Sequence, residues 1–178
     1  MFRMNSIILG LVSLFVFGTA QAVTLNISNF TDTGDGTGVA EISMTSDVDV
    51  SGFQFTLESN YVAEEFTDLD GNESWDEGEE FVDANGDNMY NAGFAVGAAP
   101  SGGAAGSNGF MMSGGNGIVL GFSLTGGTIP AMDGVLCNVD VSGIEAADGF
   151  IGLTGVTMAD PQGAPIESSA GDPWTFGD

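Results

Sequence analysis

The sequence predicts an all-β protein: an antiparallel β-sandwich with one long insertion. Three observations support this prediction. Apolar and polar residues alternate over many short segments, as they do in strands that bury one face. These segments are separated by clusters rich in glycine, aspartate and asparagine, which are typical of turns. Outside the acidic insertion no segment has the pattern of a long helix, and many short strands in a chain of this length indicate two packed sheets.

Residues 1–22 have the features of a secretion signal. Arg3 supplies a positive start, residues 7–17 are apolar, and a small-x-small cleavage site ends at Ala22. The apolar run is short for a membrane span, although a retained amphiphilic anchor is an alternative. We expect residues 23–178 to form a single domain that is secreted to the extracellular space or the cell surface.

The strands of that domain are predicted from the alternation of apolar and polar residues. We expect strands at residues 23–30, 39–45, 51–58, 118–124, 135–141, 150–158 and 174–176. The third segment sends Phe53, Phe55 and Leu57 to one face. Residues 31–38 have the composition of a turn-rich loop, and Pro161 and Pro165 are expected in turns.

Residues 95–117 are rich in glycine, alanine and serine. We expect a long, mobile loop that becomes ordered in an assembly, with a short strand at residues 110–112 as a possible exception.

An acidic insertion at residues 63–94 repeats itself. Residues 64–68 (EEFTD) recur as residues 79–83 (EEFVD), an offset of 15 residues. Counted from Glu58 to the end of the insertion, it holds 12 of the chain's 25 acidic residues. A tandem period of this kind indicates one small structural unit used twice.

The spacing of oxygen-bearing residues in the first copy matches a calcium loop. Ca²⁺ takes six to eight oxygen ligands, and an EF-hand loop supplies them from positions 1, 3, 5, 7, 9 and 12. The residues at those positions are Asp68, Asp70, Asn72, the Ser74 carbonyl, Asp76 and Glu79.

The second copy fits the same count less completely. Its candidate ligands are Asp83, Asn85, Asp87, the Met89 carbonyl and Asn91. Position 12 is Phe94, so this loop either borrows a carboxylate from Glu64, Glu65 or Glu80 or binds its ion more weakly. In both copies the glycine stands at position 4 and not at position 6, so the turn differs from that of a standard EF-hand.

A disordered acidic tract is the alternative interpretation of this region, because runs of like charge repel. Such tracts are usually poor in aromatic residues. Here aromatic side chains recur between the acids: Phe66, Trp75, Phe81, Tyr90 and Phe94. The stretch resembles the tandem calcium-binding repeats of bacterial surface proteins and, distantly, dockerin loops. We therefore expect Ca²⁺ as the bound ion.

The charge of the chain excludes several functions. Arg3 is the only Lys or Arg, and there is no His, so residues 23–178 carry 25 acids and no basic side chain. Direct binding of nucleic acid or of anionic membranes requires Lys or Arg. Without His or Lys there is no Ser-His pair and no Schiff base. Cys137 lies in an alternating segment and is expected to be a buried structural thiol.

Several segments together resemble cohesin modules. Residues 51–57 (SGFQFTL) are similar to a cohesin strand, and residues 119–123 (VLGFS) followed by residues 128–136 (TIPAMDGVL) resemble a second segment of that family. Residues 151–153 and 164–166 resemble its closing strands. The resemblance implies a jelly-roll sandwich with a non-enzymatic, extracellular recognition role. Because the acidic insertion departs from the family, we carry over the fold and no binding residues.

Three functions are consistent with these observations. The first is a calcium-dependent adhesion or assembly protein that associates with itself into a fibre or surface layer, either by docking its acidic insertion on the next copy or by strand addition at a sheet edge such as residues 23–30. The second is a carbohydrate-binding or dockerin-binding module. The aromatic residues available for sugar stacking are Trp75, Trp174, Tyr61 and Tyr90. The third is a glycoside hydrolase that uses two carboxylates, but no isolated pair stands out.

Overall fold

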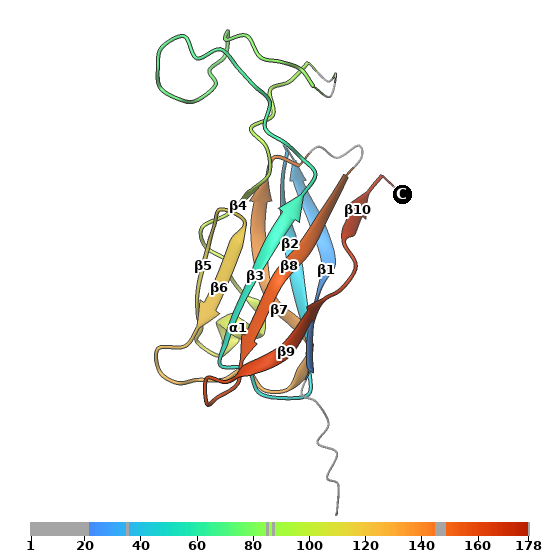
Figure 1. Cartoon of the computed structure of the whole chain (residues 1–178), viewed down its shortest axis with the longest axis vertical. Helices are drawn as coiled ribbons and strands as arrows, with labels where there is room; N and C mark the ends of the chain where they lie inside the picture. The colour runs from blue at the N-terminus through green and yellow to red at the C-terminus, as the bar shows by residue number, and fades with distance from the viewer. Residues whose placement is uncertain (1–21, 35, 85, 87, 145–148, 178) are drawn as a thin grey trace, which may run out of the picture.

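The computed structural model describes residues 22–34, 36–84, 86, 88–144 and 149–177. These residues form an antiparallel jelly-roll β-sandwich, as the sequence predicts (Figure 1). The elements are β1 (Ala22–Gly34), β2 (Thr37–Ser46), β3 (Gly52–Ser59), β4 (Ala95–Val96), α1 (Gly103–Ser107), β5 (Met111–Gly115), β6 (Ile118–Phe122), β7 (Met132–Ser142), β8 (Gly149–Ala159), β9 (Pro165–Ala170) and β10 (Trp174–Phe176). Apart from Ala22, the predicted secretion signal lies outside the described residues. Among the described residues, no helix is long and apolar enough to cross a membrane.

The strands follow one hydrogen-bonded path that folds into two layers. The order is β4-β7-β2-β1-β9-β8-β3-β6-β5, with β10 paired to β8. One layer contains β4, β7, β2 and β1, and the other contains β8, β3, β6 and β5 (Figure 1). β9 connects the layers, since it runs parallel to β1 and antiparallel to β8. All other pairs of strands are antiparallel.

The core lies between the two layers and is built by the predicted alternation. Phe53, Phe55 and Leu57 of β3 are buried together, which confirms the face predicted for this strand. Leu25 and Ile42 reach them from the opposite layer and are fully buried. Burial of one such side chain contributes about 1.5–3 kcal/mol. Cys137 is also fully buried, and this burial raises the pKa of its thiol to about 12, as expected of a structural thiol.

Two predicted loops are strand instead. β1 continues to Gly34, because Thr31 and Asp32 extend the ladder with Val39 and Gly38. The predicted loop at residues 31–38 is thus reduced to a tight turn. Pro165 begins β9 and does not lie in a turn, which is tolerated because the first residue of a strand can lack a hydrogen-bond donor. Pro161 lies in a turn, as predicted.

β1 lies between β2 and β9 in the order of strands. It pairs with β2 over nearly its whole length and with β9 over residues 22–25. The prediction of a free edge is therefore wrong for residues 23–25, which are paired on both sides, whereas residues 26–30 are paired with β2 alone.

The glycine-rich segment is packed against the sandwich and is not one long loop, and β5 confirms the short strand predicted at residues 110–112. It contains β4, α1 and β5. Gly97 N donates to Asp140 O at 2.7 Å on the β7 side, and Gly114 N donates to Ala98 O at 3.0 Å on the β5 side. Gly97 and Ala98, which are adjacent in the sequence, thus bond to the edges of the two different layers. Covering edges in this way prevents them from pairing with other chains.

Glycine is required where the segment turns into α1. Gly103 has a φ of +59°, and a Cβ built on it would lie 2.3 Å from the Leu136 carbonyl oxygen. We expect Gly103→Ala to lower the free energy of unfolding by about 2–4 kcal/mol, from overpacking against the backbone together with left-handed strain. Urea denaturation measures this change.

Gly106→Ala is the matched control in the same helix. A Cβ there has open space around it and needs no positive φ. We expect this variant to unfold at the same or a slightly higher urea concentration, since alanine favours helix. Equal stability of the two variants would contradict the packing role of Gly103.

Candidate functional site

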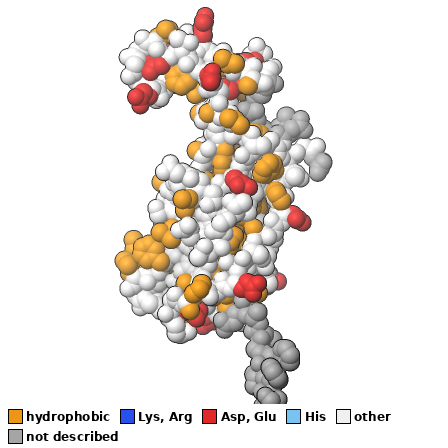
Figure 2. Space-filling view, viewed as in Figure 1, with side chains coloured by type: hydrophobic (Ala, Val, Ile, Leu, Met, Phe, Trp, Pro, Cys, Tyr) orange, Lys and Arg blue, Asp and Glu red, His pale blue; other side chains and the backbone are white. Residues whose placement is uncertain are grey.

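The acidic insertion joins β3 to β4 and projects from one end of the sandwich (Figure 1). Carboxylates are conspicuous on it in the space-filling view (Figure 2). The described part of the insertion contains no regular helix or strand. Its structure therefore depends on side chains and on single backbone hydrogen bonds.

The two sequence copies face each other across a short backbone bridge. Phe66 pairs with Phe81, its equivalent 15 residues later. Next to this bridge, Thr67 N donates to Glu80 O and Val82 N donates to Glu65 O, each at 2.8 Å. The two donors are 15 residues apart in the sequence, and so are the two acceptors, so the two bonds are equivalent in the repeat. The insertion is therefore a pair of similar units related by an approximate two-fold arrangement.

Four aromatic side chains form the centre of the pair. Trp75 and Tyr90, also equivalent in the repeat, stack with ring centroids 5.0 Å apart. Phe66 meets Tyr90 edge-on at 5.5 Å, and Phe81 meets Trp75 edge-on at 5.9 Å. The indole of Trp75 also donates to Glu79 O at 3.1 Å. This small apolar centre explains how an acidic tract adopts a defined fold.

The first loop is organised by Asp68 and Glu79. Asp68 accepts hydrogen bonds from Gly71 N at 2.6 Å and Glu73 N at 2.9 Å. These backbone donors, Glu73 first, hold the pKa of Asp68 below its usual value. Glu79 accepts hydrogen bonds from Leu69 N at 2.7 Å and Asp76 N at 3.0 Å, so its carboxylate connects the start of the loop to its end.

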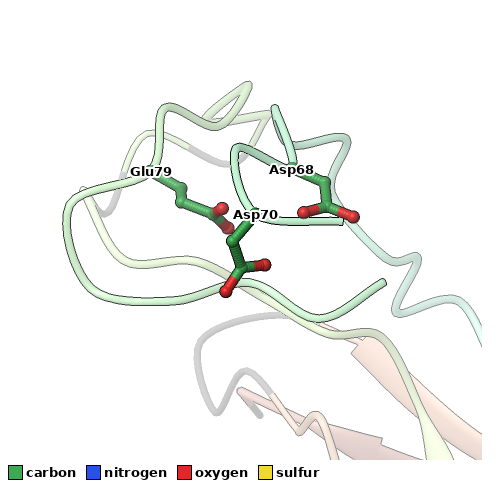
Figure 3. A group of neighbouring side chains, drawn as sticks. All are labelled: Asp68, Asp70 and Glu79. Atoms are coloured by element: carbon green, nitrogen blue, oxygen red, sulfur yellow. The ribbon is translucent and has the colours of Figure 1, made fainter. Parts of the chain in front are cut away.

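Three carboxylates of this loop converge. One oxygen each from Asp68, Asp70 and Glu79 lie within 4.8 Å of one another, and the side chains point toward a common space (Figure 3). Oxygens that ligate one Ca²⁺ at 2.3–2.6 Å can lie at most about 5 Å apart. The arrangement therefore fits the dimensions of a calcium site.

Asn72 links the carboxylates of the first loop. Its Nδ2 donates to Asp76 Oδ2 at 2.6 Å and to Asp70 Oδ2 at 3.2 Å, while its Oδ1 accepts from Ser74 N at 2.7 Å. The amide nitrogen thus lies between two acids. For Asn72 to ligate a cation through Oδ1, its amide would have to rotate.

The second loop repeats the hydrogen bonds of the first, with Glu64 as its closing acid. Asp83 accepts from Gly86 N at 2.6 Å and Asn88 N at 3.0 Å, the same offsets as at Asp68. Glu64 accepts from Ala84 N at 2.8 Å and Asn91 N at 3.0 Å, the counterparts of the two donors to Glu79.

Glu64 lies 15 residues before Glu79 and replaces the acid missing at Phe94. Of the three carboxylates considered for this role, Glu65 and Glu80 are exposed, whereas Glu64 is 7% exposed. The offset of the repeat was the signal in the sequence that could have singled it out.

The remaining candidate ligands of the second loop are less convergent. Asn85 and Asp87 lie outside the described residues. Met89 is exposed, and Asn91 is buried at the base of the insertion, where its Oδ1 accepts from Gly93 N at 2.6 Å. Asn91 O also accepts from Glu64 N at 2.9 Å. Glu64 and Asn91 together therefore fasten the insertion at its base.

The aromatic residues considered for sugar stacking take part in packing. Tyr61 is buried and lies near Phe176, and Trp174 packs against the core. Trp75 and Tyr90 stack on each other in the centre of the insertion. These contacts favour the interpretation that Trp75 and Tyr90 anchor the loops.

A second unusual surface lies on the sandwich, along β6. Its alternate residues Ile118, Leu120 and Phe122 are 38–42% exposed, and Met111 on the neighbouring β5 is 53% exposed. Leu124, just after β6, is 74% exposed. Apolar side chains gather on the side of the molecule where β5 and β6 lie (Figure 2). The sequence predicted a strand here without showing that its larger side chains face outward.

The fold has solved counterparts among cohesins. A cohesin in a type I cohesin–dockerin complex from Clostridium thermocellum matches with a TM-score of 0.53 and 13% identity, over 88% of this chain and 98% of that one. A type II cohesin dyad from an adaptor scaffoldin of Acetivibrio cellulolyticus matches with a TM-score of 0.51 and 12% identity, over 89% of this chain and 48% of that one. At this identity the likeness establishes a cohesin-like fold. No protein-family model and no curated protein sequence matches the chain.

The role of Glu64 can be tested without a metal ion. In Glu64→Gln one oxygen acceptor becomes a donor, so Ala84 N or Asn91 N loses its partner. We expect the amide that loses its partner to exchange with deuterium roughly tenfold faster in EGTA, because a lost buried hydrogen bond costs about 1–1.5 kcal/mol.

Glu65→Gln removes the same charge from an exposed position and should leave both amides unchanged. Similar exchange rates in the two variants would show that Glu64 does not organise the second loop.

Proposed function

We propose that this protein is a secreted, calcium-binding, non-enzymatic assembly protein that associates with itself as a subunit of an extracellular fibre or surface layer. The observation that carries the proposal is the paired insertion. Both loops have an aspartate at position 1 and a closing glutamate that accept equivalent backbone hydrogen bonds. A cohesin-like sandwich supports a binding role for the body of the protein.

Calcium fits the donor chemistry of the insertion. All the candidate side-chain donors are carboxylate or amide oxygens, which hard cations prefer, and the three converging carboxylates have suitable spacing. The first ion would be held by Asp68, Asp70, Asn72, Ser74, Asp76 and Glu79. The second would be held by Asp83, Asn85, Asp87, Met89 and Asn91, with Glu64 as the closing acid.

Bound calcium would relieve a large electrostatic cost. The insertion concentrates negative charge, and residues 23–178 offer no Lys, Arg or His to offset it. A divalent ion in each loop would neutralise part of this charge and connect residues that otherwise repel. The insertion would thereby become more rigid relative to the sandwich.

The residues available support a non-enzymatic role. Nucleophilic catalysis by a Ser-His or Cys-His pair is impossible without His, and the single thiol of Cys137 is buried and protonated. The carboxylates of the insertion accept backbone hydrogen bonds in both loops, which suits ion ligation better than acid–base chemistry.

A dockerin-binding module is the second candidate. The observation that favours it is the match with a TM-score of 0.53 to a cohesin that was solved in complex with a dockerin. A dockerin partner would bind this chain as a monomer, whereas an assembly protein associates without any second protein. Electron microscopy of the purified chain therefore separates the two candidates.

Calcium binding is tested by titration calorimetry. We expect about two ions per chain, and we expect Asp68→Asn and Glu64→Gln each to remove about one of them, because each variant takes a carboxylate from a different loop. Glu77→Gln, which removes an exposed charge outside both ligand sets, should retain both ions. Binding that is equally weak in all variants would indicate general attraction to acids, and the proposed sites would be rejected.

Assembly is tested by electron microscopy of the purified chain in calcium and in EGTA. We expect fibres or sheets in calcium only, since calcium both orders the insertion and lowers repulsion between copies. Dispersed particles in both conditions would rule out a self-assembling subunit. Addition of a dockerin would then test the second candidate.

A further inference from the structure

The insertion joins the sandwich through two short chain segments, residues 61–64 and 91–94, which we call the neck (Figure 1). The first segment leaves β3 and the second leads into β4. The two segments bond to each other, since Glu64 N donates to Asn91 O at 2.9 Å. Because the whole insertion is attached through these two segments, the conformation of the neck determines how the insertion is placed on the sandwich.

The neck is tightly packed and contacts the sandwich. Phe94 N donates to Tyr61 O at 3.4 Å. Gly93 has a φ of +79°, and a Cβ built on it would lie 2.6 Å from Ala63 N in the other segment. A Cβ built on Gly143, the residue that follows β7, would overlap the carbonyl oxygen of Gly93. The neck therefore has one closed conformation that small residues make possible.

The neck contains the closing acid of the second loop. Glu64 is 7% exposed, and it accepts hydrogen bonds from Ala84 N at 2.8 Å and from Asn91 N at 3.0 Å. Its carboxylate thus joins the start of the second loop to the neck. Glu79, its equivalent, accepts both of its backbone hydrogen bonds from amides of the first loop. The second loop is therefore built into the neck, whereas the first loop closes on itself.

A buried carboxylate at Glu64 requires a positive partner from outside the chain. An unpaired buried charge is costly, and residues 23–178 contain no Lys, Arg or His. Two backbone N–H groups offset part of this cost, but each oxygen of Glu64 keeps a further lone pair. Glu79 makes the equivalent two bonds and still has an oxygen within 4.8 Å of oxygens of Asp68 and Asp70. Hydrogen bonds of this kind are thus compatible with ligation of a cation.

We propose that the two calcium ions of the proposed function have different roles. The ion in the second loop, held at Glu64, closes the neck and so fixes the insertion on the sandwich. The ion in the first loop orders that loop alone. This inference rests on the proposed calcium binding and states which of the two sites regulates the position of the insertion. Opening of the neck would separate Glu64 from Asn91 and dismantle the second site, so calcium that binds there stabilises the closed neck.

The test is hydrogen–deuterium exchange of single amides, measured by NMR on the secreted chain in calcium and in EGTA. The amides of Glu64, Asn91 and Phe94 report on the neck, and those of Leu69 and Glu73 report on the first loop. We expect calcium at about 100 times its Kd to slow exchange in the neck roughly 100-fold, because an ion that binds only the closed neck stabilises it by that factor.

Asp83→Asn and Asp68→Asn are a matched pair of variants. The two aspartates are equivalent in the repeat, each accepts two backbone N–H groups, and neither belongs to the neck. Asp83→Asn should remove the second ion and abolish most of the slowing in the neck. Asp68→Asn should remove the first ion and abolish the slowing at Leu69 and Glu73, while exchange in the neck stays within about twofold of the unaltered chain.

Exchange in EGTA separates the ion from the fold. Without calcium, neither variant should change exchange in the neck, because the bonds of Glu64 do not involve Asp83 or Asp68. A neck loosened by Asp83→Asn to the same extent in EGTA and in calcium would overturn the inference. Equal loss of protection in the neck of both variants would also overturn it, because the two ions would then act as one unit.

Calcium titration of the same samples distinguishes this inference from the proposed function. If each variant loses one ion and the neck of both stays protected, calcium binding stands and the different roles are rejected. Two ions still bound by Asp83→Asn would reject the second site as assigned and the inference with it. If the unaltered chain binds no calcium, the proposed function itself fails.

Discussion

The absence of positive side chains is the constraint on which the rest of the structure depends. A carboxylate in residues 23–178 cannot pair with Lys, Arg or His, so it must be solvated, bind a cation, or accept hydrogen bonds from the backbone or from hydroxyl and amide side chains. In the insertion the backbone performs this role. Asp68, Asp83, Glu64 and Glu79 each accept two backbone N–H groups. The loops therefore fold around their acids, with the aromatic centre holding the two loops together.

The sandwich meets the same constraint by separating charge from its contacts. Its core is apolar, and its only described buried polar or charged residue outside the insertion is Ser46. Sheet edges are covered by the glycine-rich segment instead of being protected by lysine, which the chain lacks. Close approach of that segment requires small residues. A Cβ at Gly114 would lie 2.1 Å from the Gly97 carbonyl oxygen.

Much of the fold could be predicted from the sequence, because strict alternation and turn residues are local signals. The alternation of apolar and polar residues directly predicts the strands that contain Phe53, Leu25 and Ile42. The glycine-rich segment could not be predicted, since its order comes from contacts with β7 and β5, which are distant in sequence. Composition alone suggested mobility there. In the candidate site, spacing indicated the loops and the 15-residue offset pointed to Glu64, but its contacts with Ala84 N and Asn91 N are seen only in the fold.

β6 shows why local pattern is insufficient to decide which face of a strand is buried. Hydrophobicity alone favours Ile118, Leu120 and Phe122 as the buried face of this strand. The structure buries Val119 and Gly121 instead. Gly121 leaves room for the ring of Phe53, whose atoms would lie 2.1 Å from a Cβ there. The two-residue turn at residues 116–117 has positive φ at both positions, and it fixes the register with β5. The packing of one aromatic ring and the geometry of one tight turn therefore place the larger side chains of β6 in solvent.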